Sequence, residues 1–295
     1  YIGSATVRYA IEHSMNVCAV RALTVTVGLE KGYEYLQKFG FTTLVDGTDE
    51  NYPGHTDIAQ STALGGITRG VYNMELTAAF ASIANGGEYT EPVLYTQILD
   101  HDGNVLIDNT TPDTHEVIKE STAYLLTSAM EDVVRKGTGT PARLSNMTAA
   151  GKTGTTDDST DLWFVGYTPY YTGGVWGGYD ANKSMSGMNS NWHKTLWKNI
   201  MERVHEGLED KDFEIPSSVV RKSICRESGL LAVDGCPTIT EYFDKDTLPT
   251  QSCSGHITEP EEPVDEDPDS STAQDPAAEP SGPTTPTTPT DPDEP

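Results

Sequence analysis

The sequence predicts an α+β domain in which helices pack against an antiparallel sheet. Several segments place apolar residues at helical spacing and end at a glycine. Two later runs, 161–167 and 171–179, are rich in aromatic and β-branched residues. Only Thr168-Pro169-Tyr170 joins them. Because no crossover helix separates the two runs, we expect them to pair as antiparallel strands with helices packed against the sheet.

The first half of the chain contains most of the expected helices. Apolar periodicity predicts helices over 7–13, 17–27, 30–39, 74–84 and 121–136. Gly28, Gly40 and Gly137 follow three of them at the positions where a helix ends. Between the last two helices, the apolar runs 93–99 and 105–108 flank Asp-His-Asp-Gly-Asn, which predicts a β-hairpin.

The second half begins with a short run of small residues at 149–155, which we interpret as a strand beside the two aromatic strands. A long amphipathic helix over 191–208 follows, with Trp192, Leu196, Ile200 and Val204 at helical spacing. The expected order is therefore helices, a hairpin, a helix, consecutive strands and a final helix.

Charge and composition divide the chain further. Residues 258–295 hold twelve acidic residues, no lysine or arginine, and ten of the 18 prolines. Such a segment cannot bury enough apolar surface to offset its chain entropy, so we expect a disordered tail. Residues 209–257 are less regular and hold three of the four cysteines, which indicates a small module. The expected organisation is a domain over 1–208, this module, and the tail.

The same numbers exclude several classes of protein. The 295-residue chain has a formal net charge of −26, so it would repel nucleic acid. No run of about 18 apolar residues occurs, so we expect no membrane span within the chain. The first residue is tyrosine rather than methionine, and we expect a fragment whose targeting segment or anchor lies upstream.

The strongest local motif is Lys152-Thr153-Gly154-Thr155 in the strand over 149–155. On one face of this strand, the lysine ammonium and a threonine hydroxyl could point together into a cleft and bind a carboxylate. Gly154 would leave room for a substrate backbone at the strand edge. The alternative is an exposed strand with a lysine of no special role.

A second motif, Ser14-Met15-Asn16, lies at the end of the first short helix. The serine could relay a proton and the asparagine amide could hold a carbonyl in one cavity. The alternative is helix capping, for which serine and asparagine are common residues.

Both motifs, in this order, occur in the transpeptidase domain of class A penicillin-binding proteins, which this sequence resembles. Three segments carry the resemblance: TVRYAIEHSMNVCAVRAL, MELTAAFASIANGGEYTEPVLYTQILDHDGNVL and AAGKTGTTDDSTDLWFVGYTPYYTGGVWGGYD. It extends over about residues 1–207. The resemblance implies the penicillin-binding and serine β-lactamase-like fold, lacking its N-terminal part.

The resemblance also implies a peptidoglycan D,D-transpeptidase that acts through a serine acyl-enzyme, needs no cofactor, binds β-lactams and acts on stem peptides ending in D-Ala-D-Ala. Ser14 would belong to the proton relay, Asn16 would bind the acyl side chain, and Lys152 would keep the cleft positive. Thr153 and Thr155 would bind the terminal carboxylate. The enzyme would work on the extracellular face of the bacterial cytoplasmic membrane, attached only through an anchor absent from this chain.

The sequence departs from the family pattern at the nucleophile. The family's Ser-x-x-Lys motif lies upstream of Ser-x-Asn, and no Ser-x-x-Lys occurs in this chain. We therefore expect the chain as given to be inactive. The alternatives are a D,D-carboxypeptidase or β-lactamase-like hydrolase, in which water is the acceptor, and a non-catalytic wall-associated scaffold of the same fold.

The cysteines allow two interpretations. Three thiols and an imidazole could form a tetrahedral zinc site, and these residues are Cys225, Cys236, Cys253 and His256. Their spacing lacks a Cys-x-x-Cys pair, and an oxidising extracellular setting favours one disulfide with one cysteine left over. We favour the disulfide, without a metal. Cys18, in an apolar helix, is expected to be a small buried residue.

Overall fold

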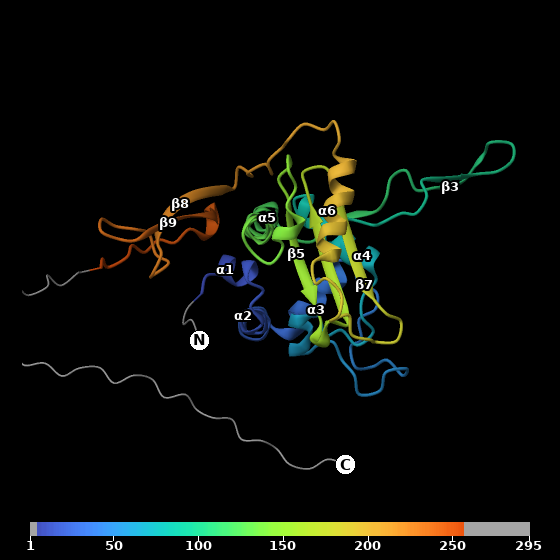
Figure 1. The fold of residues 1–295 in the computed structure, drawn as a ribbon, viewed down its shortest axis with the longest axis horizontal. Coiled ribbons are helices and arrows are strands. Elements are labelled where there is room, and N and C mark those ends of the chain that lie inside the picture. The colour runs from blue at the N-terminus through green and yellow to red at the C-terminus, as the bar shows by residue number, and fades with distance from the viewer. Residues whose placement is uncertain (1–4, 257–295) are drawn as a thin grey trace, which may run out of the picture. The chain divides into compact units, whose positions relative to one another are not determined.

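The computed structural model describes residues 5–256 of the chain (Figure 1). The acidic tail expected at 258–295 lies outside the described residues. The chain divides into two compact units, Tyr1–Ser254 and Gly255–Pro295, and the fold below is that of the first. Among the residues described, no helix combines the length and apolar character needed to cross a bilayer.

The N-terminal region is helical but less regular than expected. It contains α1 (Val7–Glu12), α2 (Asn16–Arg21), a π-helical turn (Ala22–Val27) and α3 (Leu29–Lys38). The helix predicted over 17–27 is helical throughout and ends before Gly28, but its second half is π-helical rather than α-helical. That half carries a β-branched run, and the hydroxyl of Thr24 donates to the carbonyl of Val20 at 2.8 Å, which competes with regular helical bonding.

The middle of the chain follows the expected order, with one addition. After a short 3-10 turn (Gln60–Leu64) come α4 (Asn73–Ala84), β1 (Glu88–Thr90), β2 (Gln97–Leu99), β3 (Val105–Asp108), β4 (Thr114–Glu116) and α5 (Glu120–Arg135). The β2–β3 hairpin is confirmed, and all its strand residues are exposed. The β1–β4 pair was not predicted, because each strand has only three residues.

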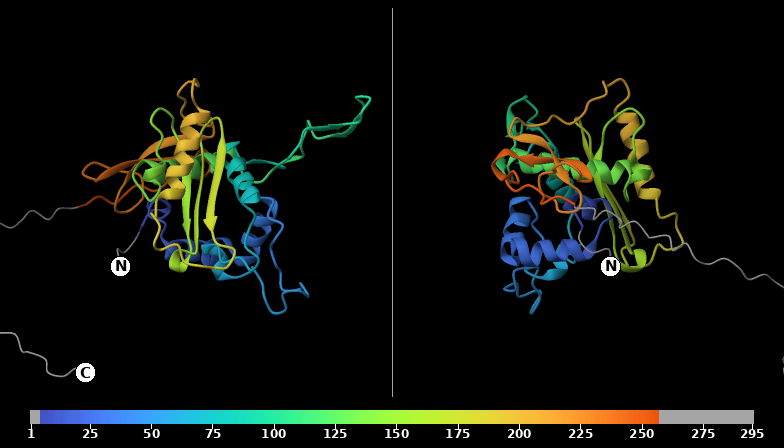
Figure 2. Two further views of the ribbon diagram at one scale, coloured as in Figure 1. Left: turned by 45° about the vertical axis from the view of Figure 1, so that its right-hand side comes forward. Right: turned by 90° about the vertical axis from the view of Figure 1, so that its left-hand side faces the viewer.

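The central sheet consists of three antiparallel strands in the order β5–β6–β7. They are β5 (Ala150–Thr155), β6 (Asp161–Tyr167) and β7 (Thr172–Gly178). Short 3-10 turns precede β5 (Thr140–Ala142) and follow it (Asp157–Ser159). Helix α6 (Trp192–Val204) lies along one side of this sheet (Figure 2). The strand arrangement predicted from the aromatic runs is therefore confirmed.

Each face of the sheet contributes to a different part of the core. On the α6 face, Phe164 is fully buried, and its ring meets that of Trp197 edge-on at a centroid distance of 5.0 Å. On the other face, Ala150 and Tyr167 pack with residues of α4 and α5, including Ile83 and Met130. The sheet is thus held between helices on both sides.

Four aromatic residues in or next to β6 and β7 differ in their burial. Only Phe164 is buried, whereas Trp163 is half-buried and Trp176 and Tyr179 are exposed. Directly paired strand residues share a face, and Trp163 pairs with Trp176 on the face opposite Phe164. Their rings lie 6.2 Å apart, and Trp176 donates to Asp161 at 2.9 Å.

The C-terminal part contains a hairpin that the sequence did not reveal. Strands β8 (Val219–Cys225) and β9 (Thr238–Asp244) pair antiparallel over seven residues, and a 3-10 turn (Lys245–Thr247) follows. The guanidinium of Arg8 in α1 donates to both carboxylate oxygens of Glu241 in β9, at 2.7 and 2.8 Å. The same group donates to the carbonyl of Ser128 in α5 at 2.7 Å. One side chain therefore joins the hairpin, α1 and α5.

Phe164→Ala should lower the free energy of unfolding by about 3–5 kcal/mol, because it leaves a cavity between the sheet and α6. Trp163→Ala is the matched control, since this neighbour lies half-buried on the other face and should cost less. Urea unfolding monitored by circular dichroism measures the free energy of unfolding of both variants. Equal losses for the two variants would contradict this assignment of the core face.

Candidate active site

Ser14 occupies the junction between α1 and α2 in an unusual backbone conformation. Its φ is +53°, in the left-handed region that non-glycine residues rarely adopt. The Ser14 N–H donates to the carbonyl of Ile11 at 3.2 Å, and the next N–H, of Met15, donates to Ala10 at 2.9 Å. The side chain is exposed. A strained turn thus presents the serine hydroxyl outward, as often occurs at functional sites.

Helix capping does not account for the Ser14-Met15-Asn16 motif. The N-cap of α2 is Met15, which has no side-chain capping bond, and the C-cap of α1 is His13. Asn16 is the first residue of α2, and its side chain is exposed. The side chains of Ser14 and Asn16 are therefore both exposed at the same turn and are not used to cap a helix.

The position of this turn depends on how α1 packs against the end of α5. Glu12 is buried, and one of its oxygens lies 3.0 Å from the ammonium of Lys136. A Cβ at Gly137 would come within 2.5 Å of the Glu12 carbonyl oxygen, so only glycine allows this approach. The Thr138 N–H donates to the same carbonyl at 3.3 Å. The glycine predicted to end α5 therefore also allows the end of α1 to pack closely against the end of α5.

Lys152 on β5 meets Ser14 directly. Its ammonium donates to the Ser14 hydroxyl at 2.7 Å and to the Thr153 carbonyl at 3.0 Å. Burial lowers the pKa of Lys152 to about 8. The group is therefore mostly charged at pH 7, yet close enough to neutrality to exchange protons. Two residues from opposite halves of the sequence form one polar pair.

The threonines of the motif lie differently from what the sequence predicts. Lys152 pairs with Val165 and Thr153 with Phe164, so strand alternation places the lysine and threonine side chains on opposite faces. The expectation that both point from one face is wrong. Thr153 instead contacts the hydroxyl of Thr138 at 2.9 Å. Because β5 is an outer strand of the described sheet, side chains on either face can still reach its open edge.

The remaining motif residues have packing roles as well. A Cβ at Gly154 would lie 3.1 Å from Cβ of Trp163 on β6. The glycine is therefore explained by close packing against its cross-strand neighbour, independently of any substrate at the strand edge. Thr155 ends β5 with its side chain exposed. These positions leave the last part of the β5 edge accessible.

Two residues near this edge were missed by the sequence analysis. Thr138 follows the end of α5 and contacts Thr153, and Lys194 of α6 donates to the Thr138 carbonyl at 3.4 Å. Burial lowers the pKa of Lys194. No motif marks either residue, because only the packing of α6 and the end of α5 brings them to the strand.

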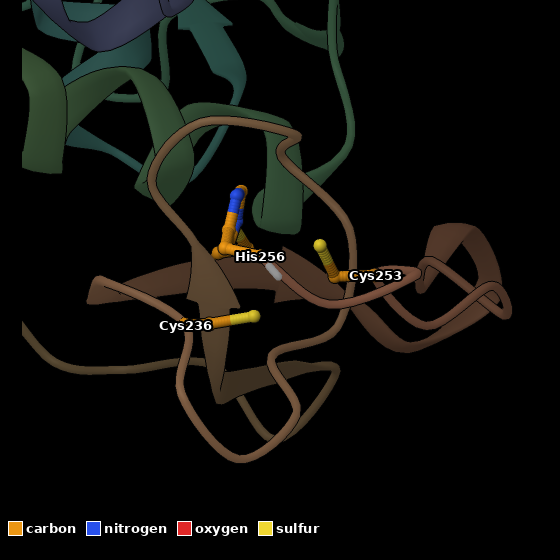
Figure 3. A group of neighbouring side chains, drawn as sticks. Cys236, Cys253 and His256 are labelled. Atoms are coloured by element: carbon orange, nitrogen blue, oxygen red, sulfur yellow. The ribbon is translucent and has the colours of Figure 1, made fainter. Parts of the chain in front are cut away.

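A second group of side chains lies in the C-terminal part. It consists of three cysteines and one histidine, Cys225, Cys236, Cys253 and His256, and is called the cysteine–histidine cluster below. Their ligand atoms all lie within 4.8 Å of one another. Figure 3 shows three of these side chains beside the strands of this region. Cys18, expected to be buried, is only half-buried.

Comparison with known families matches two parts of the chain. The penicillin binding protein transpeptidase domain matches residues 2–202. The penicillin-binding protein 1A C-terminal domain matches residues 215–258.

Relatives and solved structures agree with these matches. Penicillin-binding protein 1A of Clostridium novyi is 35% identical over 267 residues, covering 87% of this chain and 29% of the relative. The Aquifex aeolicus protein of the same name is 34% identical, covering 85% of this chain and 33% of the relative. The crystal structure of penicillin-binding protein 1A from Haemophilus influenzae has a TM-score of 0.68 at 23% identity, covering 83% of this chain and 41% of that one.

The chain spans about a third of the length of these curated relatives. The solved structure is too distant in sequence to show more than the fold, but the family match includes both motifs and the sheet that carries the second. The contact between Ser14 and Lys152 thus lies within the matched region, and the chain belongs to the penicillin-binding protein transpeptidase family.

Proposed function

We propose that this chain forms part of a serine-type D,D-transpeptidase that crosslinks peptidoglycan stem peptides. The observation that carries the proposal is the 2.7 Å hydrogen bond from Lys152 to Ser14. In the proposed reaction, a serine hydroxyl attacks the carbonyl of the penultimate D-Ala, the amide bond breaks, and the terminal D-Ala leaves with the proton. The amine of a second stem peptide then displaces the serine from the ester.

The proposed roles follow the chemistry of each group. Ser14 passes a proton toward the departing nitrogen, with Lys152 as its charged neighbour. Asn16 binds the acyl side chain. Thr153 and Thr155 bind the terminal carboxylate at the edge of β5, and the Thr155 N–H helps stabilise the oxyanion, a role worth about 3 kcal/mol in other acyl-transfer enzymes.

The nucleophile itself is proposed to belong to a segment outside these 295 residues, because the sequence contains no Ser-x-x-Lys.

The organisation proposed is a transpeptidase domain over 1–208, a module over 209–257 and a tail over 258–295, on the extracellular face of the cytoplasmic membrane. The match of residues 2–202 to a transpeptidase domain supports crosslinking over simple hydrolysis. β-Lactam binding is supported by the solved structure of the PonA1 protein from Mycobacterium tuberculosis in complex with penicillin V. It is 25% identical to this chain with a TM-score of 0.63, covering 74% of this chain and 61% of that one.

Fluorescent penicillin should label no residue of the 295-residue chain, because acylation needs the missing serine and its lysine. A longer chain that adds the family's upstream Ser-x-x-Lys segment should form a covalent adduct, detected by mass spectrometry. The control is the longer chain with the serine of that segment replaced by alanine. An adduct on the 295-residue chain would show that the nucleophile has been misassigned.

Lys152 should titrate with a pKa of about 8 in the folded chain, because it is desolvated beside Ser14. Its charge should be present at pH 7 and disappear as the pH rises through 8, weakening the attraction for a carboxylate. NMR of ¹³C-methylated lysines measures this, and Lys152→Arg assigns the signal. Lys31→Arg is the matched control, since a hydrogen bond to Glu34 raises the pKa of Lys31. A Lys152 signal titrating as high as that of Lys31 would exclude the proposed environment.

Ser14→Ala and Ser14→Gly in the longer chain should both slow acylation by about 100-fold or more, because both lose the hydroxyl that relays the proton. Only glycine relieves the positive φ, so Ser14→Gly should unfold at higher urea concentration than Ser14→Ala. Acylation rates and urea midpoints separate the two effects. If either variant acylates at the original rate, Ser14 has no part in proton transfer.

A further inference from the structure

We propose that the cysteine–histidine cluster binds one structural zinc ion. The inference does not depend on the transpeptidase proposal, because it concerns other residues in a different part of the chain. It also reverses the preference for a disulfide drawn from the sequence alone, and it rests on three observations: the positions of the four side chains, their mutual distances, and the small core around them.

The fold brings the ligands together from three separate segments. Cys225 ends β8, and Cys236 lies two residues before β9 begins. Cys253 is placed by backbone bonds to Leu231: the Cys253 N–H donates to the Leu231 carbonyl at 2.8 Å, and the Leu231 N–H donates to Gln251 at 3.0 Å. His256 follows Cys253 by three residues, so one segment supplies two ligands. The backbone, not the side chains alone, thus fixes the arrangement.

The distances within the cluster suit a tetrahedral zinc site. Zinc binds thiolate sulfur at about 2.3 Å and imidazole nitrogen at about 2.0 Å, which places ligand atoms about 3.5–3.8 Å apart. In the structure all four ligand atoms lie within 4.8 Å of one another. Side-chain rotations and contraction by about 1 Å would complete the site. Three thiolates and one imidazole are a ligand set that zinc favours.

The core around these residues is too small to hold this part of the chain by apolar burial alone. Over residues 211–256, only four residues are buried: Val219, Ile224, Cys225 and Cys253. Two of the four are members of the cluster. Small modules with so little buried apolar surface are commonly held by a metal ion or a disulfide.

Zinc accounts for the cluster better than a disulfide does. A disulfide would join two of the thiols and leave the third thiol and the imidazole beside it without a common role. A zinc ion would use all four, with the three thiol protons released to solvent as the thiolates bind and the histidine kept neutral. Because the four protein ligands fill a tetrahedral site, no position is open for substrate, and the ion would be structural.

The experiment uses the untagged 295-residue chain, purified without chelator and dialysed against zinc-free buffer. Zinc per chain, measured by plasma mass spectrometry, should be about one, as for a single closed four-ligand site. Cys236→Ser should lower zinc retention at least tenfold in the presence of a competing chelator. Cys18→Ser is the matched control, because Cys18 lies outside the cluster, and it should retain the ion.

A second measurement keeps the test informative if Cys236→Ser folds poorly. His256→Cys preserves four zinc ligands and should retain the ion, whereas His256→Ala should lose it to the chelator. Denaturing mass spectrometry after alkylation without reductant should then find all four thiols of the original chain modified. Two unmodified cysteines with no zinc would establish the disulfide and overturn the proposal, as would zinc retention equal in Cys236→Ser and Cys18→Ser.

Discussion

The arrangement of the candidate active site depends on the packing of α1 against the end of α5. The carbonyl of Glu12 approaches Gly137 more closely than any side chain would permit, and the Glu12 carboxylate is buried beside Lys136. This contact brings the turn after α1 against β5, where Ser14 accepts a hydrogen bond from Lys152. A larger residue at position 137 would push α1 away and separate the pair.

The contact also explains how a lysine can be held partly buried. Desolvation disfavours the ammonium and lowers its pKa to about 8, while the Ser14 hydroxyl and the Thr153 carbonyl accept its hydrogen bonds. Both acceptors are neutral, so they compensate for lost water without the full stabilisation that a carboxylate would give. The balance between desolvation and these two neutral acceptors therefore leaves the lysine mostly charged at pH 7 and able to release its proton at slightly higher pH.

The sequence predicted the features that depend on local periodicity, but not those that depend on contacts between distant segments. Glycine stops and aromatic runs were sufficient for α5 and most of the central sheet, and the family resemblance carried by two short motifs indicated that Ser14 and Lys152 belong to one site. The motif alone could not show that the side chain of Thr153 lies on the opposite face of β5 from that of Lys152 and forms a hydrogen bond with Thr138. The β8–β9 hairpin was missed because its apolar residues stand mostly in adjacent pairs, as in VVRKSIC and TITEYFD, with charged residues between or beside them, so the strands show no clear alternation.

The same hairpin connects the C-terminal part to the candidate active site through Arg8. Its guanidinium binds Glu241 of β9 through two bonds and also meets the carbonyl of Ser128 in α5. Arg8 lies in α1, the helix that ends just before Ser14. A bidentate charged pair restricts orientation as well as distance. Whatever holds the hairpin rigid therefore also helps to fix the direction of α1, and through it the position of the serine hydroxyl relative to Lys152.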